Sequence, residues 1–271
     1  MRRQLVLAFL ALLVGCHEPP PPSPSAPTSL RPEIERGGQR HAPLALEPLA
    51  GEPFERVTFD GGIEAWIARP LAATSPRPVI VGVHGAGDRA DWSCTEWAAT
   101  TGGQAWVVCP RGVPSQWAGF HSWGSAEMIA SRAELVLAHV REHYGPYVSN
   151  APLTYGGWSQ GATLASSVIA SRPGVYGTAI LVEAGYTPLD ENAVVHGLLT
   201  GGVTKLVVSC SSMQCRDLSA RIARVRPKRL AMWTNDVGLR GHWFDQPVFD
   251  SLGKVLREVD SAEPEPKVAV Q

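Results

Sequence analysis

A serine stands between two glycines at Gly157-Trp158-Ser159-Gln160-Gly161, which is the pattern G-x-S-x-G. A short apolar run, residues 153–155, precedes the pattern, and a run with helical character, residues 162–171, follows it. Between a strand and a helix, the glycines permit a turn sharp enough to lift the serine hydroxyl above a sheet. The start of the helix then offers backbone N–H groups to an oxyanion. This setting predicts that Ser159 is a nucleophile.

The segments around this motif alternate between predicted strands and helices, after a hairpin whose strands flank Gly61-Gly62. We expect strands at 57–59, 63–68, 79–83, 105–109, 153–155, 178–183, 205–209 and 229–233, and helices at 126–144, 162–171, 218–225 and 248–258. Strand–helix alternation after a hairpin predicts one α/β domain, in which helices cover both faces of a mostly parallel, twisted sheet.

The eleven residues from Tyr155 to Ala165 resemble the α/β-hydrolase superfamily, in particular small serine esterases and polyhydroxyalkanoate-depolymerase-like lipases. His84-Gly85-Ala86-Gly87-Asp88, after the predicted strand 79–83, is similar to the H-G-x-G loop of such hydrolases. The resemblance covers roughly residues 55–258 and implies the α/β-hydrolase fold. It also implies an oxyanion hole formed by the backbone N–H groups of Ala86 and Gln160, with His84 bracing the loop.

The resemblance also implies a chain order of serine, acid and histidine. Of the eight histidines, only His196 and His242 follow Ser159. His196 falls in a polar stretch between two predicted strands, whereas His242 follows the strand predicted at 229–233. We expect His242 to be the base, because a neutral imidazole accepts a proton near neutral pH.

The acid is where the sequence departs from the family. The loop after the predicted strand 205–209 usually carries it, but here that loop holds no acid before Asp217, an early helix residue. Glu183 ends the preceding strand, 178–183, and a carboxylate closing an apolar strand is costly without a partner. We therefore predict Glu183 as the acid, with Asp217 as the alternative. Asp190, Asp236 or no acid at all remain open.

Four tryptophans lie close to these motifs. Trp117 and Trp123 precede the helix 126–144, Trp158 is next to the nucleophile and Trp243 follows the base. As a hypothesis, they line an apolar or aromatic acyl pocket.

The five cysteines divide into one near the N-terminus and four in the predicted domain. An even number in an oxidising compartment favours disulfides, and the most local pairing is Cys94–Cys109 with Cys210–Cys215. We expect no metal site, because the spacings contain no C-x-x-C pair and no histidine is suitably placed.

The N-terminus has the features of a secretion signal. Arg2 and Arg3 precede an apolar run that is too short to span a membrane, and the run closes at Leu13-Val14-Gly15-Cys16. That ending resembles the bacterial lipobox, which implies cleavage before Cys16 and lipidation of its thiol. His17 after the cysteine favours, by resemblance to lipoprotein sorting rules, the outer membrane, facing the periplasm or the exterior. An ordinary secretory signal or an uncleaved anchor is the alternative.

Four segments follow from this reading. They are a signal peptide at 1–15, a lipidated Cys16 with a Pro-rich tether at 16–53, a hydrolase domain at 54–259 and a flexible tail at 260–271. Lys and Arg number 24 against 25 Asp and Glu, for a net charge of −1, and no basic block is present. This balance argues against a nucleic-acid partner, because phosphate contacts need clustered cations.

Two classes of function fit these residues. The first is a lipid-anchored serine hydrolase that cleaves small-molecule or polymer esters through an acyl-enzyme on Ser159, without a cofactor. A serine peptidase is a variant of this class. The second is a non-catalytic binding lipoprotein on a hydrolase scaffold, which the missing acid motivates. The sequence does not determine the oligomeric state.

Overall fold

The computed structural model describes residues 46–261. The predicted signal peptide, Cys16 and its lipidation, and most of the predicted tether and tail lie outside the described residues. The elements follow one another as β1 Phe54–Phe59, η1 Asp60–Gly62, β2 Ile63–Ala68, β3 Val79–Val83, α1 Ala90–Thr100, β4 Trp106–Pro110, β5 Val113–Pro114, β6 His121–Ser122, α2 Ala126–Tyr144, η2 Gly145–Tyr147, β7 Leu153–Trp158, α3 Gln160–Ala170, β8 Tyr176–Val182, α4 Glu191–Thr200, β9 Lys205–Cys210, α5 Met213–Val225, β10 Ala231–Asp236 and α6 Gln246–Ser261.

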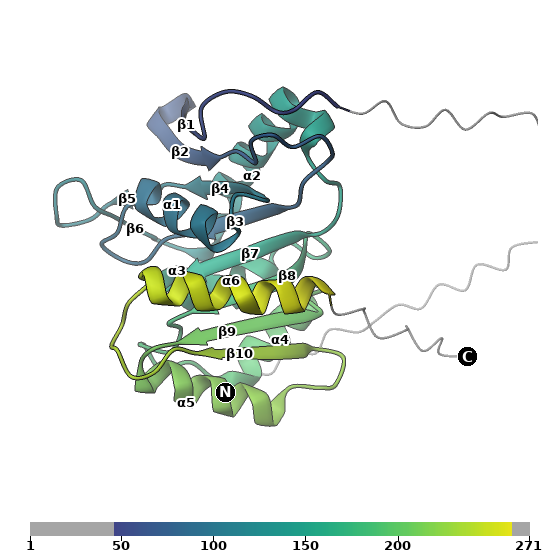
Figure 1. The fold of residues 1–271 in the computed structure, drawn as a ribbon. Coiled ribbons are helices and arrows are strands. Elements are labelled where there is room, and N and C mark those ends of the chain that lie inside the picture. The colour runs from purple at the N-terminus through teal and green to yellow at the C-terminus, as the bar shows by residue number, and fades with distance from the viewer. Residues whose placement is uncertain (1–45, 262–271) are drawn as a thin grey trace, which may run out of the picture. The chain divides into compact units, whose positions relative to one another are not determined.

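Eight of the strands form one sheet in the order β1-β2-β4-β3-β7-β8-β9-β10 (Figure 1). The β1–β2 and β2–β4 pairs are antiparallel, and every pair from β4 to β10 is parallel. The predicted mostly parallel sheet is therefore confirmed. The short strands β5 and β6 form a separate hairpin.

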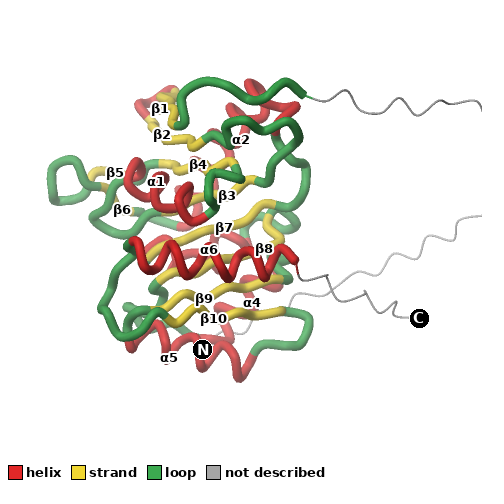
Figure 2. The backbone as a smooth tube through the Cα atoms, in the orientation of Figure 1, coloured by secondary structure: helices red, strands yellow, loops and turns green. Residues whose placement is uncertain are grey.

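Helices cover both faces of the sheet (Figure 2). One buried cluster joins α1 and α6 to one face, and a larger cluster joins the other four helices to the opposite face. Neighbouring strand residues alternate between the clusters, as the pleat requires. In β4, for example, Val107 packs toward α1 and α6, while Val108 packs toward the opposite face. The apolar β-branched runs are thus buried on both sides, as parallel strands are.

The parallel register brings the carboxyl ends of five strands to one edge of the sheet. Val83 of β3 pairs with Gly157 of β7, and Trp158 pairs with Val182 of β8. Val182 in turn pairs with Ser209 of β9, and Cys210 of β9 pairs with Asp236 of β10. The residues that follow these strands therefore gather at this edge, where open α/β sheets place their binding sites.

Several boundaries differ from the predicted ones. The helix Ala126–Tyr144 agrees at both ends, and its N-cap Ser125 accepts a hydrogen bond from the Met128 amide. Helices α1 and α4 were not predicted, because neither has a strong polar–apolar periodicity. His196 consequently lies on α4 rather than in a loop. Leu49, inside the predicted tether, is buried and bonds through its backbone to residues 72 and 73.

The two predicted disulfides have different outcomes. Cys210 and Cys215 are bonded across a sequence separation of 5. The Cys94–Cys109 prediction is wrong in this structure, where both are buried free thiols. The Cys94 thiol, on α1, instead donates to the Val107 carbonyl at 3.7 Å, so it is held as a small apolar side chain between helix and sheet. Within residues 46–261, no helix combines the length and apolarity needed to cross a membrane.

Candidate active site

The sharp turn predicted at Ser159 is present between β7 and α3. Ser159 has φ +52° and ψ −110°, a conformation that non-glycine residues rarely adopt. The flanking glycines are needed for close approach. A Cβ at Gly157 would lie 2.6 Å from the Gly161 carbonyl carbon, and one at Gly161 would lie 2.5 Å from the Val83 carbonyl oxygen. The turn can form only without these side chains, which explains the G-x-S-x-G pattern.

His242 contacts the serine directly. Its Nε2 lies 2.7 Å from Ser159 Oγ, although 83 residues separate the two in sequence. The imidazole lies among aromatic rings, with the Trp158 ring 5.7 Å and the Tyr186 ring 4.8 Å from its own centroid. The loop after β10 therefore brings the predicted base to hydrogen-bonding distance of the predicted nucleophile.

Glu183 is the carboxylate that the structure places beside His242. Its Oε2 lies 3.5 Å from Nδ1 of the imidazole, an ion-pair distance slightly longer than an ordinary hydrogen bond, and its side chain is 1% exposed. Glu183 directly follows β8 and has φ +54°, so backbone strain occurs at this residue as well as at Ser159. The serine, the imidazole and the carboxylate thus form one continuous series of contacts.

The alternative acids are engaged elsewhere. Asp217 is exposed on α5 and pairs with Arg221 one turn along the helix. Asp190 caps α4 by accepting from the Ala193 amide at 2.7 Å, and Asp236 pairs with Arg216. None of the three has a contact with His242 among the described residues.

Hydrogen bonds keep the Glu183 carboxylate ionised in its buried position. Burial alone raises its pKa, but the contacts with His242, Ser212 and Ser211 outweigh burial, so the pKa lies below its ordinary value. Ser211 contributes twice, because its backbone N–H and its hydroxyl both contact Oε1. The carboxylate can therefore orient an imidazole and stabilise its protonated form.

Two backbone N–H groups near Ser159 are unpaired. Gly85 donates to Asp88 at 3.3 Å and Gly87 donates to Ser122 at 2.9 Å, while the Ala86 N–H between them meets no acceptor among residues 46–261. Gln160 is the first residue of α3, where the N–H has no intrahelical partner. The loop lies against the turn, since a Cβ at Gly85 would be 3.2 Å from the Ser159 Cβ.

His84 braces that loop from behind. Its Nδ1 bonds to the Gly85 carbonyl at 2.7 Å, and its Nε2 accepts from the Gly112 amide at 3.0 Å. Burial lowers the pKa of His84 to about 4. A neutral imidazole with both nitrogens engaged is not available to carry a proton at neutral pH.

The four tryptophans have different positions. Trp158 is half-buried beside His242, while Trp117 and Trp243 are 58% and 60% exposed. Trp123 is 4% exposed, its ring stacks on His84 at 4.6 Å, and its indole N–H donates to the His84 carbonyl. Trp123 is thus part of the support of the loop and does not face open space.

Three side chains at the site were not singled out from the sequence. Ser211 binds Glu183, and Tyr186 packs on His242. The Gln160 side chain pairs with both the N–H and the carbonyl of Trp123, at 2.9 and 3.0 Å. Of these three, only Ser211 had a sequence signal: it lies in the loop after β9, where the family usually carries the acid. The described part of the chain has no group of three His, Cys, Asp or Glu side chains that could hold a metal ion.

Comparisons with known proteins place this arrangement in a known fold. No protein-family model and no curated protein sequence matches the chain. Among solved structures, a Klebsiella pneumoniae protein assigned as a dienelactone hydrolase aligns over 77% of this chain and 98% of its own, with a TM-score of 0.57 and 11% identity. A Pyrobaculum calidifontis esterase aligns over 79% and 86%, with a TM-score of 0.52 and 17% identity.

A third solved structure, a carboxylesterase from Mesorhizobium loti, aligns over 76% of this chain and 99% of its own, with a TM-score of 0.51 and 16% identity. At such identities the likeness concerns the backbone. The mostly parallel eight-stranded sheet with helices on both faces agrees with it. The chain has the α/β-hydrolase fold.

Proposed function

We propose that the protein is a serine hydrolase that cleaves carboxylic esters. The observation that carries this proposal is the series of contacts from Ser159 Oγ to His242 Nε2, and from His242 Nδ1 to Glu183 Oε2, at the open edge of the sheet. Fold alone would not support an activity, because one fold hosts many functions. Here a nucleophile, a base and an orienting acid come together from three separate loops.

The first half of the reaction follows from this geometry. Ser159 Oγ attacks the ester carbonyl carbon while His242 Nε2 takes the hydroxyl proton, and the negative charge on the carbonyl oxygen is stabilised by the N–H groups of Ala86 and Gln160. The C–O bond to the leaving alkoxide then breaks, and His242 returns the proton to that oxygen. An alcohol leaves, and the acyl group stays on Ser159.

Water completes the cycle by the same steps. His242 takes a proton from water, the resulting hydroxide oxygen attacks the acyl carbon, and the Ser159 oxygen leaves with the proton from His242. Glu183 remains ionised throughout and stabilises the imidazolium that forms twice per cycle. The products are an alcohol and a carboxylic acid, so neither an oxidant nor a cofactor enters the balance.

Two observations favour esters as the substrate class. Two of the three structural neighbours described above are named as an esterase and a carboxylesterase. The exposed rings of Trp117 and Trp243 also offer apolar surface near the site, which suits an acyl or aromatic group. The binding-protein alternative was motivated by a missing acid, and the position of Glu183 removes that motivation.

A fluorophosphonate probe tests the proposal. The wild-type protein should be labelled covalently at Ser159, and Ser159→Ala, His242→Ala and heat denaturation should each abolish the labelling. His196→Ala serves as the matched control, because His196 is an exposed histidine on α4 and should leave labelling unchanged. Folded wild-type protein that is neither labelled nor active on an ester library would overturn the proposal.

We also propose that the chain is anchored in a bacterial cell envelope through a lipid on Cys16. The support is the sequence motif alone, since Cys16 lies outside residues 46–261. Metabolic labelling with a fatty-acid probe should mark the wild-type protein and not Cys16→Ser. Equal labelling of both proteins would contradict the anchor.

A further inference from the structure

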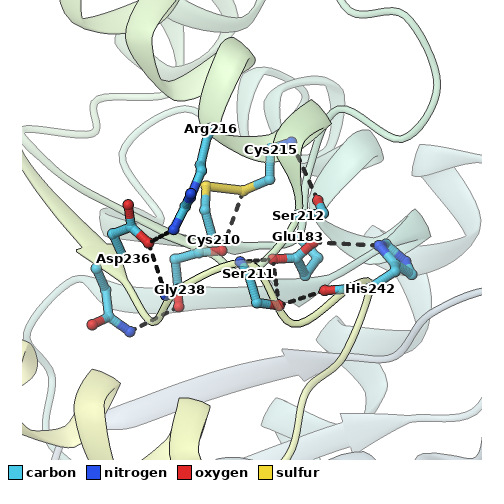
Figure 3. Close-up of a disulfide and its surroundings, with 12 residues drawn as sticks. Glu183, Cys210, Ser211, Ser212, Cys215, Arg216, Asp236, Gly238 and His242 are labelled. Atoms are coloured by element: carbon cyan, nitrogen blue, oxygen red, sulfur yellow. Dashed lines mark hydrogen bonds and ion pairs between the residues drawn. A yellow bond between two sulfur atoms is a disulfide. The ribbon is translucent and has the colours of Figure 1, made fainter.

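Ser211 lies between Glu183 and the loop that carries His242. The reaction proposed above gives Ser211 no direct role. It follows β9 and is 1% exposed. Its backbone N–H and its hydroxyl both contact Oε1 of Glu183, the hydroxyl at 3.0 Å. The same hydroxyl lies 2.7 Å from the carbonyl oxygen of Gly241, the residue before His242. Figure 3 shows Ser211 beside both Glu183 and the loop that ends in His242.

The backbone of Ser211 makes the second connection. Its carbonyl accepts from the amides of Arg240 and Gly241, at 2.9 and 3.0 Å. Gly241 has φ +99°, so the loop turns there in a conformation that favours glycine. Every polar group of Ser211 is therefore bonded either to Glu183 or to the turn that delivers His242.

These contacts leave the two oxygens of the acid unequal. Oε1 receives both donors from Ser211, whereas Oε2 faces Nδ1 of His242 at 3.5 Å. A buried carboxylate with one oxygen occupied cannot exchange the two oxygens by rotation without breaking those bonds. Ser211 thereby fixes the orientation of the carboxylate whose second oxygen faces the imidazole.

A covalent ring holds Ser211 in place. The Cys210–Cys215 disulfide closes a short loop that contains Ser211 and Ser212, and Figure 3 shows it adjoining them. Ser212 is also the N-cap of α5, where its hydroxyl accepts from the Cys215 amide at 3.4 Å. The loop after β9, where the sequence leads one to expect an acid, instead supplies the hydrogen bonds that orient the acid of the preceding strand.

We propose that Ser211, held by the Cys210–Cys215 ring, is a positioning residue that sets Glu183 and the His242 loop relative to each other. This inference rests on the proposed function and adds to it. The single hydroxyl proton of Ser211 lies between two acceptors, the Glu183 carboxylate and the Gly241 carbonyl, so its loss loosens both at once. The acyl-binding surface is untouched, and the effect falls on kcat rather than on KM.

Steady-state ester hydrolysis by the full-length protein tests the inference in a double-mutant cycle. Ser211→Ala should lower kcat about tenfold with KM unchanged within about twofold. In a Glu183→Ala background the same change should cost at most about twofold, because the contact with Glu183 is already lost and only the hydrogen bond to the Gly241 carbonyl remains to be removed. A purely structural role would lower activity by the same factor in both backgrounds.

Ser209→Ala is the matched control. Ser209 is a fully buried serine on β9, two residues before Ser211, and its hydroxyl accepts from Asn235 at 2.9 Å. Only its backbone carbonyl, which the substitution keeps, bonds to Glu183, where it accepts from the amide at 2.9 Å. It should lower the melting temperature comparably and leave kcat within about twofold. If Ser211→Ala does not fold, Ser211→Gly, which also removes the hydroxyl and adds no thiol beside the disulfide, provides the comparison.

The outcomes separate the two proposals. Wild-type protein without fluorophosphonate labelling or ester turnover overturns the proposed function and this inference together. Active wild-type protein with an unchanged kcat in Ser211→Ala, or with equal losses in both backgrounds, overturns the positioning role alone. A kcat loss confined to the background that keeps Glu183 supports both.

Discussion

The Oγ of Ser159 and the Nε2 of His242 lie 2.7 Å apart, although the two residues come from loops at the ends of β7 and β10. Those strands are not neighbours in the sheet, since β8 and β9 lie between them. The loop after β10 therefore crosses the ends of two strands to reach the serine. It contacts Ser211 and Glu183 on the way, so that all four residues lie in one series of contacts.

Glu183 should be the acid on which activity depends. Glu183→Gln keeps the side-chain volume but cannot stabilise the imidazolium, and we expect kcat to fall by about 10²–10⁴-fold. Asp217→Asn, on the exposed face of α5, should change kcat less than about twofold. Ester kinetics of both purified variants decide the assignment, which a larger loss in Asp217→Asn would reverse.

Removal of the disulfide should affect both stability and rate. In Cys210→Ala/Cys215→Ala, the loss of a ring of this size lowers the free energy of unfolding by about 2 kcal/mol, as urea denaturation would measure. We expect kcat to fall severalfold, because Ser211 is less constrained. Peptide mapping by mass spectrometry should find Cys210 linked to Cys215, and Cys94 and Cys109 as thiols. A linked Cys94–Cys109 peptide would contradict the structure.

The contribution of His84 to the stability of the domain should decrease as pH falls through the range in which His84 titrates. Burial lowers the pKa of His84 from an ordinary 6.5 to about 4, so the folded state binds fewer protons than the unfolded state between these values. The stability present above pH 6.5 is therefore lost progressively down to pH 4, by about 3 kcal/mol. Urea midpoints at pH 7, 6, 5 and 4 measure it in a Glu96→Gln background, because the raised pKa of Glu96 changes stability in the opposite direction over this range.

The matched comparison is between His84→Asn and His196→Asn. The first should be less stable at pH 7, because its hydrogen bonds to the loop change, and should lack most of the decline between pH 6.5 and 4. The second replaces an exposed histidine and should retain the decline. A Glu96→Gln protein equally stable at pH 7 and pH 4.5 would show that His84 is not held neutral by the fold.

Glu96 should destabilise the folded state at alkaline pH. Burial, reinforced by the nearby charge of Asp88, raises the pKa of Glu96 to about 8. The folded state then binds more protons than the unfolded state between the ordinary value of 4.5 and 8, so its stability decreases as pH rises through that window. Glu96→Gln should be more stable than wild type by roughly 1–3 kcal/mol at pH 8.5 and no more stable at pH 4.

Two tryptophans should behave differently on truncation. Trp123→Ala removes a buried ring and its bond to the His84 carbonyl, and should lower the free energy of unfolding by about 3–5 kcal/mol. Trp243→Ala should leave stability within about 0.5 kcal/mol and raise KM for aromatic esters more than for acetate esters. If Trp243→Ala changes KM for neither ester class, Trp243 does not contact the substrate.

The sequence by itself determined the sharp turn at Ser159 and most strands and helices. These features depend on local physics: two glycines that allow close backbone approach at Ser159, β-branched runs buried on both faces, and the helical spacing and Ser125 cap of α2. The His242 prediction came from chain order in a recognised family. Helices α1 and α4 escaped prediction, because their polar and apolar residues do not follow a strong helical period.

The tertiary structure decided which residues from different strands come into contact. Glu183, Asp217, Asp190 and Asp236 are comparable carboxylates in sequence, and only the placement of β8 beside β7 and β9 brings one of them to His242. The tertiary structure also gives Ser211 its two partners, Glu183 and Gly241. It places Trp123 against His84 and leaves Cys94 and Cys109 as thiols. Each outcome is a contact between residues far apart in the chain, and local propensity carries no information about such contacts.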